Sequence, residues 1–232
     1  MKKILVFVLL TGMLFTIFYN CNTSATTPPL TSFYLINASP DSQGLDFFLD
    51  GSLVTGNLIY GQDSGYFSAS PGIHELQVRK AGESNMLIDV NIPLIAGKSY
   101  SIFAINSLSN LTPAAVSDNP PTPPSDSAEI RLLNFCVNSP VLNAQLATSG
   151  DTLRYFSRFF NDQSSTDTAR ASFKRVIAGT YILNLINTED SALPGTFPGI
   201  ILSKGKIYTI YLKGLYDSTS VQSIGNTLIQ HN

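Results

Sequence analysis

Three aspartates lie close together in the chain and are the first residues whose type and spacing could do chemistry. Asp41, Asp46 and Asp50 offer the carboxylate oxygens that calcium prefers as ligands. Their spacing departs from the twelve-residue calcium-binding loop, and no glutamate closes it. Pro-Asp at 40–41 and Asp-Gly at 50–51 are dipeptides typical of tight turns. We interpret the three carboxylates as turn and strand-edge residues, with a weak surface cation site as the alternative, and we predict no metal centre.

The histidines and the cysteine of the mature part offer little further chemistry. His74 falls in a run that alternates polar and apolar residues, and His231 is one residue from the C-terminus. A zinc site needs three or four convergent ligands. Cys136 lies in an apolar run with no suitable histidine partner in view, so we interpret it as a buried small side chain rather than a nucleophile. Without a Gly-x-Ser-x-Gly elbow or a phosphate-binding glycine loop, we predict neither an enzyme nor a cofactor.

The elements that must position these residues are short β-type runs separated by turn signals. The predicted strands of the first half are residues 32–37, 45–49, 64–69, 74–79, 86–92 and 99–105. No window of helical length shows a clean apolar stripe with capping residues. A chain with 16 Gly, 13 Pro and only 13% charged residues suits a turn-rich sheet protein. We therefore expect an all-β fold.

The N-terminus predicts export. Two lysines follow Met1, and the apolar run at 4–19 is short for a permanent bilayer span. Cys21 comes soon after this run, and a flexible polar segment at 22–29 follows it. This order resembles the lipobox of bacterial lipoproteins, in which the cysteine carries a diacylglycerol and becomes the first mature residue. Residues 18–20 differ from the small residue that the lipobox prefers before the cysteine, so a plain signal peptide and an uncleaved anchor remain alternatives.

Export and lipidation fix several further expectations. We predict that the protein is held in the cell envelope, at the outer membrane, by lipid on Cys21. Cleavage before that residue would shift the formal charge from −2 to about −4, because it removes two lysines. A mild negative charge without clustered Lys and Arg gives no basis for a nucleic-acid partner. With Cys21 lipidated, Cys136 has no internal disulfide partner, and stability must come from apolar cores.

The mature chain repeats itself. The turn and strand at 96–102 return at 204–210, and residues 71–76 correspond to 178–183. Residues 35–37 correspond to the region around Asn134 with a one-residue ambiguity. The second copy is longer, and its extra residues are expected in loops at 151–168 and 187–198. A proline-rich segment between the copies favours an extended, stiff linker.

These features give the domain organisation. We predict a signal peptide at 1–20, a lipidated cysteine and tether at 21–31, a first β-sandwich at 32–117, a linker at 118–126 and a second β-sandwich at 127–232. Whether the two sandwiches pack together or swing about the linker is left open by the sequence.

Several motifs of the first copy occur together in one bacterial family. They are Asn-Ala-Ser-Pro-Asp at 37–41, the hairpin Leu-Asp-Phe-Phe-Leu-Asp-Gly at 45–51, Tyr66, Pro-Gly at 71–72 and the segment 92–100. In these motifs the copy resembles the family known as domain of unknown function 4397. The second copy shares few of them and lacks the Ser-Pro-Asp and Asp-Gly elements. The resemblance implies exported, often lipid-anchored, immunoglobulin-like or transthyretin-like antiparallel β-sandwiches without an assigned activity.

A repeated Asp-Ser or Asp-Thr pattern at and after the linker is a separate signal. It is similar to the O-glycosylation motif of exported proteins in one large phylum of Gram-negative bacteria. The acceptor hydroxyls would be those of Ser127, Thr152, Thr168, Ser191 and Ser218. The alternative is ordinary turn chemistry, since Ser and Thr after Asp often bond to nearby backbone.

We therefore predict a cell-envelope lipoprotein that acts as a non-catalytic binding or structural module with a protein or glycan partner. One alternative is a carbohydrate-binding accessory lipoprotein of a surface polysaccharide-uptake system, which predicts a row of solvent-facing aromatic rings. The aromatic candidates are Tyr60, Tyr66, Phe67, Tyr155 and Phe156. A second alternative is an envelope hydrolase, which predicts a concave pocket with convergent polar groups. The sandwich edges would also suit strand addition.

Overall fold

The computed structural model describes residues 27–164, 168–216 and 222–232. Within these ranges sixteen β-strands form four sheets of four strands, and the remaining elements are three short 3-10 helices. The predicted all-β fold is confirmed. No helix in the described ranges is long and apolar enough to span a bilayer. The predicted signal peptide and Cys21 lie outside the described residues.

The first half folds into a β-sandwich. Its strands are β1 (Thr31–Asn37), β2 (Leu45–Leu49), β3 (Ser52–Leu58), β4 (Asp63–Ala69), β5 (Gly72–Lys80), β6 (Met86–Leu94), β7 (Ser99–Ile105) and β8 (Thr112–Ser117), with the 3-10 helix η1 (Leu108–Asn110) before β8. One sheet has the order β4-β1-β7-β8 and the other the order β3-β2-β5-β6. Between them lies an apolar core to which Phe33, Phe47 and Val78 contribute fully buried side chains.

The second half repeats this arrangement. Its strands are β9 (Ser127–Asn134), β10 (Leu142–Ala147), β11 (Thr152–Arg158), β12 (Lys174–Ile177), β13 (Gly179–Asn187), β14 (Gly195–Leu202), β15 (Ile207–Lys213) and β16 (Gly225–Gln230), with η2 (Asp162–Ser164) and η3 (Thr168–Ala171) between β11 and β12. The sheet orders are β12-β9-β15-β16 and β11-β10-β13-β14. Each is an order of the first half with eight added to every strand number, so the two halves share one topology.

Two of the four sheets are mixed, whereas we expected all of them to be antiparallel; the other two sheets are antiparallel throughout. Strand β1 runs parallel to β7, and β9 runs parallel to β15. A parallel pair needs a long crossover connection, and here the intervening strands, most of them in the opposite sheet, supply it. Strands β7 and β15 are each followed by one more antiparallel strand.

The predicted loop at 151–168 was wrong in part, because it contains β11. Leu153 and Tyr155 of this strand lie opposite Leu146 and Ala144 of β10 and pack into the second core. The alternation of Leu153 and Tyr155 with Arg154 is itself a strand signal, which the loop prediction overlooked. The predicted loop at 187–198 likewise includes the start of β14.

A buried asparagine ends the first strand of each half and resolves the ambiguous alignment. The Nδ2 of Asn37 donates to the carbonyl of Leu58 at 2.8 Å, and its Oδ1 accepts from the N–H of Ser39 at 3.0 Å. Asn134 repeats both contacts, with the carbonyl of Arg158 at 3.4 Å and the N–H of Cys136 at 3.0 Å. Each side chain thereby ties the end of its strand to the loop that follows and to the end of a strand in the opposite sheet.

Replacing Asn37 with alanine is expected to lower the free energy of unfolding by about 1–3 kcal/mol, because buried backbone groups of Leu58 and Ser39 lose their partner. Asn134→Ala is the matched variant and should cost a similar amount. Urea denaturation at neutral pH measures both. A loss below about 0.5 kcal/mol in both variants would show that the two asparagines are not structural ties.

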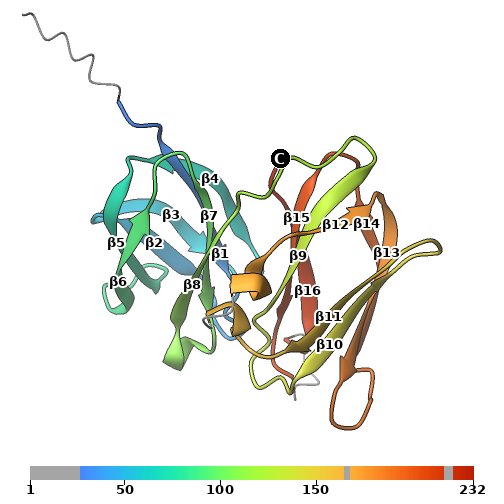
Figure 1. Cartoon of the computed structure of the whole chain (residues 1–232). Coiled ribbons are helices and arrows are strands. Elements are labelled where there is room, and N and C mark those ends of the chain that lie inside the picture. The colour runs from blue at the N-terminus through green and yellow to red at the C-terminus, as the bar shows by residue number, and fades with distance from the viewer. Residues whose placement is uncertain (1–26, 165–167, 217–221) are drawn as a thin grey trace, which may run out of the picture.

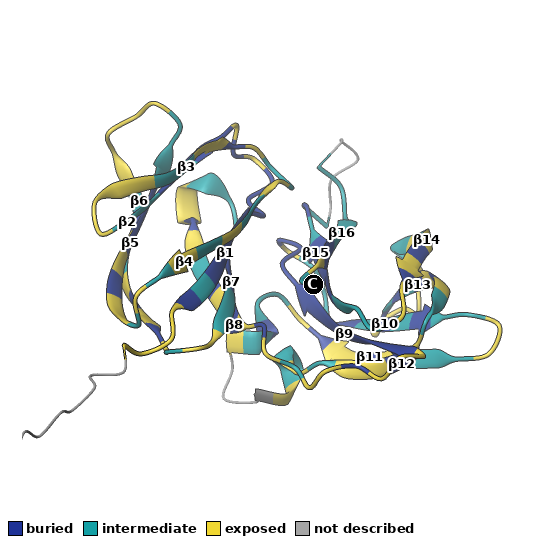
Figure 2. Cartoon of the chain, turned by 90° about the horizontal axis from the view of Figure 1, so that it is seen from above, coloured by how far each residue is buried: buried dark blue, intermediate teal, exposed yellow. Residues whose placement is uncertain are grey.

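The two sandwiches pack against each other through their central sheets (Figure 1). The inter-sandwich core consists of Tyr34, Ile36, Ala38, Phe103, Ile105, Ala114 and Val116 from the first half, with Leu133, Phe135, Tyr211 and Ile229 from the second. The ring centroid of Phe103 lies 4.8 Å from that of Phe135 and 5.3 Å from that of Tyr211. The inner strands of these two sheets, β1, β7, β9 and β15, are therefore covered on both faces. Figure 2 shows β9 as buried, whereas β6 and β11 carry exposed residues.

Candidate functional site

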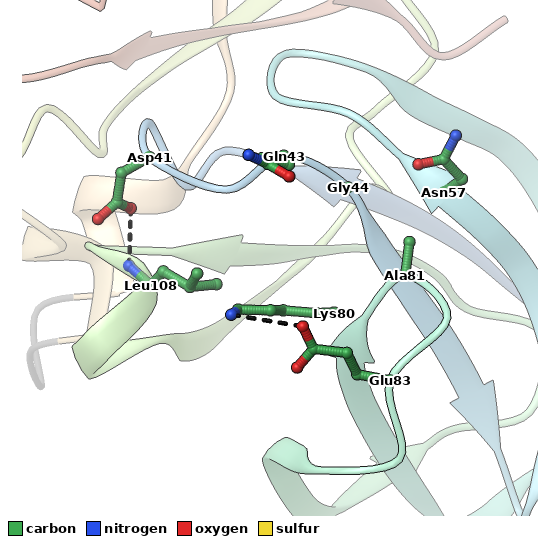
Figure 3. Close-up of a pocket in the computed structure, with 8 residues that line it drawn as sticks. All are labelled: Asp41, Gln43, Gly44, Asn57, Lys80, Ala81, Glu83 and Leu108. Atoms are coloured by element: carbon green, nitrogen blue, oxygen red, sulfur yellow. Dashed lines mark hydrogen bonds and ion pairs between the residues drawn. The ribbon is translucent and has the colours of Figure 1, made fainter.

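A polar pocket of about 370 Å³ opens at one end of the first sandwich (Figure 3). Its lining comes from the β1–β2 loop, from β3, from the end of β5 with the turn after it, and from η1. The lining residues are Asp41, Gln43, Gly44, Asn57, Lys80, Ala81, Glu83 and Leu108. The volume lies within the range of small-molecule sites, about 300–1,000 Å³.

Two of the aspartates singled out in the sequence hold the backbone around this pocket, and one of them, Asp41, also lines it. The Oδ1 of Asp41 accepts from the N–H of Leu108 at 2.7 Å and so ties the β1–β2 loop to η1. Asp46 accepts from the N–H of Asn57 at 2.7 Å and from the N–H of Gly82 at 3.0 Å. These contacts hold the β1–β2 loop, β3 and the turn after β5 in place before any ligand binds.

The third aspartate lies elsewhere. Asp50 sits at the other end of β2, in the tight turn where both it and Gly51 have positive φ. Its carboxylate accepts from the N–H of Glu75 at 2.9 Å and contacts Nδ1 of His74 at 2.6 Å. The hydrogen bond from His74 lowers the pKa of Asp50, and the same bond raises the pKa of His74. Across the described ranges, no three His, Cys, Asp or Glu side chains gather as metal ligands would.

The floor of the pocket depends on a glycine. A Cβ at Gly44 would lie 2.2 Å from the Oδ1 of Asn57, so the Asn57 side chain would have to move to admit any larger residue. At the mouth, the Nζ of Lys80 lies 3.6 Å from an oxygen of Glu83 (Figure 3). The side chains of Gln43 and Asn57 line the pocket, and their amides make no hydrogen bond with the residues that the structure describes.

A second polar cluster is buried between the sandwiches. Asp118, predicted as the first linker residue, has a fully buried side chain that forms an ion pair with the buried Arg131 of β9. Its Oδ2 also accepts from the hydroxyls of Ser101 and Tyr66, each at 2.8 Å. Burial lowers the pKa of Arg131, and the Asp118 carboxylate opposes that shift. The charges of the pair thus compensate each other inside the protein.

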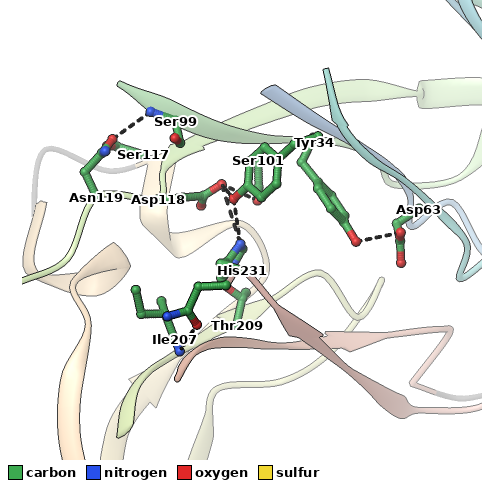
Figure 4. A network of polar contacts seen from close by, with 12 residues as sticks. Tyr34, Asp63, Ser99, Ser101, Ser117, Asp118, Asn119, Ile207, Thr209 and His231 are labelled. Atoms are coloured by element: carbon green, nitrogen blue, oxygen red, sulfur yellow. Dashed lines mark hydrogen bonds and ion pairs between the residues drawn. The ribbon is translucent and has the colours of Figure 1, made fainter. Parts of the chain in front are cut away.

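His231 joins this cluster from the C-terminus (Figure 4). Its Nδ1 lies 2.7 Å from the Tyr66 hydroxyl, and its Nε2 lies 2.7 Å from Oγ1 of Thr209, which also accepts from Nε of Arg131 at 2.9 Å. The tautomer protonated on Nδ1 satisfies all of these contacts, and we assign it from the network. Burial lowers the pKa of His231 to about 4, against the smaller opposing effect of Asp118. His231 is therefore neutral at neutral pH.

Sequence reasoning missed this cluster, although one signal was available. Arg131 interrupts an apolar run that extends from Ile130 to Leu133. A charge in the middle of a strand that is apolar on both faces indicates a buried partner. The sequence does not identify Asp118 as that partner, because the pairing depends on how the sandwiches pack.

The five candidate aromatic residues do not form one solvent-facing row. Tyr66 is 37% exposed, and its hydroxyl reaches the buried cluster. Tyr60 lies under the Nζ of Lys213, which is 4.7 Å from the ring centroid. Phe67 packs on the first core and Tyr155 in the second, whereas Phe156 is 64% exposed. These positions give no aromatic platform for a glycan.

The predicted glycosylation sites differ in accessibility. Ser127 is buried at the start of β9, so modification there would require the unfolded chain. Thr152 is half-buried and Ser191 is exposed. Ser218 and the side chain of Thr168 lie outside the described residues. Cys136 is fully buried, as expected for a small apolar side chain.

Three outer strands carry a proline that weakens them as templates for strand addition. Pro93 lies in β6, Pro113 in β8 and Pro198 in β14, and each of these strands is at the edge of its sheet. Proline lacks the N–H that an added strand would pair with, and its presence on edges discourages association.

Comparison with known proteins adds a family and two distant structures. A family model described as "Domain of unknown function (DUF4397)" matches residues 31–145. No curated protein matches the chain. Among solved structures, a CBM26-family module of Amy13K from Eubacterium rectale, in complex with maltoheptaose, is 11% identical with a TM-score of 0.27, over 85% of this chain and 96% of that one. A leucine-rich repeat protein from Bacteroides thetaiotaomicron is 12% identical with a TM-score of 0.21, over 79% of this chain and 26% of that one.

Proposed function

The chain belongs, through residues 31–145, to the DUF4397 family, and from this membership we propose that it is a non-catalytic binding module of the cell envelope. In this proposal lipid on Cys21 holds the protein to the outer membrane. Both sandwiches stand outside the cytoplasm as one body, and the first of them presents the polar pocket to a ligand.

The observation that carries the proposal is the buried contact between the sandwiches. A tether between independent modules needs no buried ion pair, whereas Asp118 and Arg131 are both removed from water. Leaving either charge unpaired would be costly, so the two halves should keep one relative orientation. A fixed orientation suits presentation of a preformed site.

The composition of the pocket supports binding rather than catalysis. Its lining contains no histidine, cysteine or serine. Lys80 is paired with Glu83, and one oxygen of Asp41 accepts a backbone hydrogen bond. A nucleophile activated by a neighbouring base is therefore not among the lining residues.

The anchor is tested by replacing Cys21 with serine in the native host. The wild-type protein should incorporate labelled palmitate and fractionate with the outer membrane. Cys21→Ser should lose the label and leave the membrane fraction, because no acyl chain remains to hold it. Cys136→Ser is the matched control and should keep both the label and the location. A wild-type protein that stays unlabelled in the cytoplasm would refute the proposal.

A further inference from the structure

We propose that the pocket at Gly44 binds an uncharged, polyhydroxylated ligand, with a sugar ring as the chemical class, and that the second sandwich has lost this site. The inference rests on the proposed binding function and specifies its ligand.

The lining selects for hydroxyl groups. Gln43 and Asn57 each offer one amide acceptor and two donors, and Asp41 offers a carboxylate. A hydroxyl both donates and accepts, so vicinal hydroxyls can satisfy amides and a carboxylate together. An apolar ligand would leave these groups without partners, at a cost of several kcal/mol if all were desolvated, on the order of 1–3 kcal/mol for each.

The charges disfavour an anionic ligand. Asp41 and Glu83 outnumber Lys80, and the ion pair between Lys80 and Glu83 leaves the Asp41 carboxylate as the uncompensated charge of the lining. An anionic ligand would be repelled by this carboxylate. Uncharged hydroxyls avoid that repulsion and can donate hydrogen bonds to Asp41.

The walls are fixed before a ligand arrives. The side chains of Asp41 and Asp46 hold η1, β3 and the turn after β5, and the N–H of Ala81 donates to the carbonyl of Gly44 at 3.0 Å. Because these loops need no ordering on binding, weak individual hydrogen bonds can add up to measurable affinity.

The second half shows the same backbone with the pocket chemistry replaced. The N–H of Thr188 donates to the carbonyl of Val141 at 3.1 Å, which identifies Val141 as the counterpart of Gly44. The pairing of Leu45 with Lys80 is matched by that of Leu142 with Asn187, so a buried asparagine replaces the lysine.

The second half retains the β-bulge of the first. Asn57 has a φ of 52° and Ser157, its counterpart, a φ of 51°, and the N–H of Ser157 bonds to Asn143 as that of Asn57 bonds to Asp46. The loop scaffold is thus common to both halves. The glycine floor, the lysine and the second amide are specific to the first.

The test is titration of the purified, isotope-labelled full-length chain, held in a detergent without a sugar headgroup, followed by NMR. The probes are glucose, galactose, mannose and xylose, their methyl glycosides, and maltose, with acetate and phosphate as anionic probes. At least one sugar should shift the amide signals of Gly44, Ala81, Gly82 and Leu108 saturably. If the methyl glycosides bind as well, the natural ligand would be a sugar residue within a glycan. If only the reducing sugars bind, it would be a free sugar.

Variants then separate the site from general effects. Gly44→Val should abolish the shifts because its side chain occupies the floor, and Lys80→Asn should weaken binding roughly tenfold by removing a charged donor. Lys98→Asn makes the same chemical change at the opposite end of the sandwich and should leave binding unchanged. Because Gly44→Val introduces a close contact, Lys80→Asn provides an independent readout if that variant fails to fold.

Three results would overturn the inference: no sugar shifts these signals at tens of millimolar, only acetate or phosphate does, or the shifts lie outside the pocket. If any of these occurs while Cys21 still carries lipid, the proposed envelope module stands and the sugar site alone is refuted.

Discussion

Replacing Arg131 with methionine is expected to lower the free energy of unfolding by about 3–5 kcal/mol. The guanidinium is fully buried and pairs with the equally buried carboxylate of Asp118. Methionine fills much of the volume but leaves that carboxylate with the hydroxyls of Ser101 and Tyr66 as donors and with the imidazole of His231, neutral at neutral pH, 3.8 Å away. A charge buried without an opposite charge is among the most destabilising changes in a protein. Urea denaturation at neutral pH gives the free energy directly.

The double variant Arg131→Met with Asp118→Asn is the control. It removes both charges, so it should recover at least half of the loss, because no unpaired charge remains. Arg154→Met, an exposed arginine of the same half, should change stability by less than about 0.5 kcal/mol. A single variant that costs less than about 1 kcal/mol would mean that water reaches the contact between the sandwiches.

Acidification from pH 6.5 to pH 4 is expected to destabilise the protein by up to about 3 kcal/mol through His231 alone. Burial lowers the pKa of this imidazole from 6.5 to about 4, so the unfolded chain binds the proton more readily than the folded one. The stability linked to His231 is therefore complete above about pH 6.5. It falls as the pH drops toward 4 and has no further dependence below that value.

The measurement is the free energy of unfolding as a function of pH for the wild type, His231→Gln and His74→Gln. His231→Gln should remove most of the slope between pH 6.5 and 4. His74 gives the opposite sign: Asp50 raises its pKa, so its contribution is present at low pH and is lost as the pH rises through that raised value. His74→Gln should therefore keep the acid slope. Equal slopes in the wild type and His231→Gln would contradict the prediction.

Much of the fold could be predicted from the sequence because its strands alternate with clear turn signals. Strands β2 and β7 have the predicted bounds, and β1 differs by one residue. Strand β3 was missed, because its Ser-Leu-Val-Thr-Gly-Asn-Leu sequence contains a glycine and its pairing with β2 is broken by register shifts. A bulged strand does not keep the period of two on which such predictions depend.

The sites were harder to predict than the strands. Asp41 lies in a turn as predicted, whereas Asp46 lies in β2, an inner strand of its sheet. The pocket beside them depends on loops that are distant in sequence. Lys80 and Leu108 meet Asp41 only after the two sheets have packed. The buried role of Asp118 was hidden by the prolines after it, which made the whole segment look like linker. Contacts between sheets and between sandwiches leave little pattern in the local sequence.

The sandwiches meet through the same surface of each. The sheet β4-β1-β7-β8 faces β12-β9-β15-β16, its own counterpart, and Phe103 touches Tyr211, the residue at the equivalent register position. A patch that covers its own equivalent is the geometry of a two-fold symmetric homodimer. The chain is in effect such a dimer in one polypeptide. Its joined subunits are then free to diverge, so that one can keep a binding site while the other serves as its support.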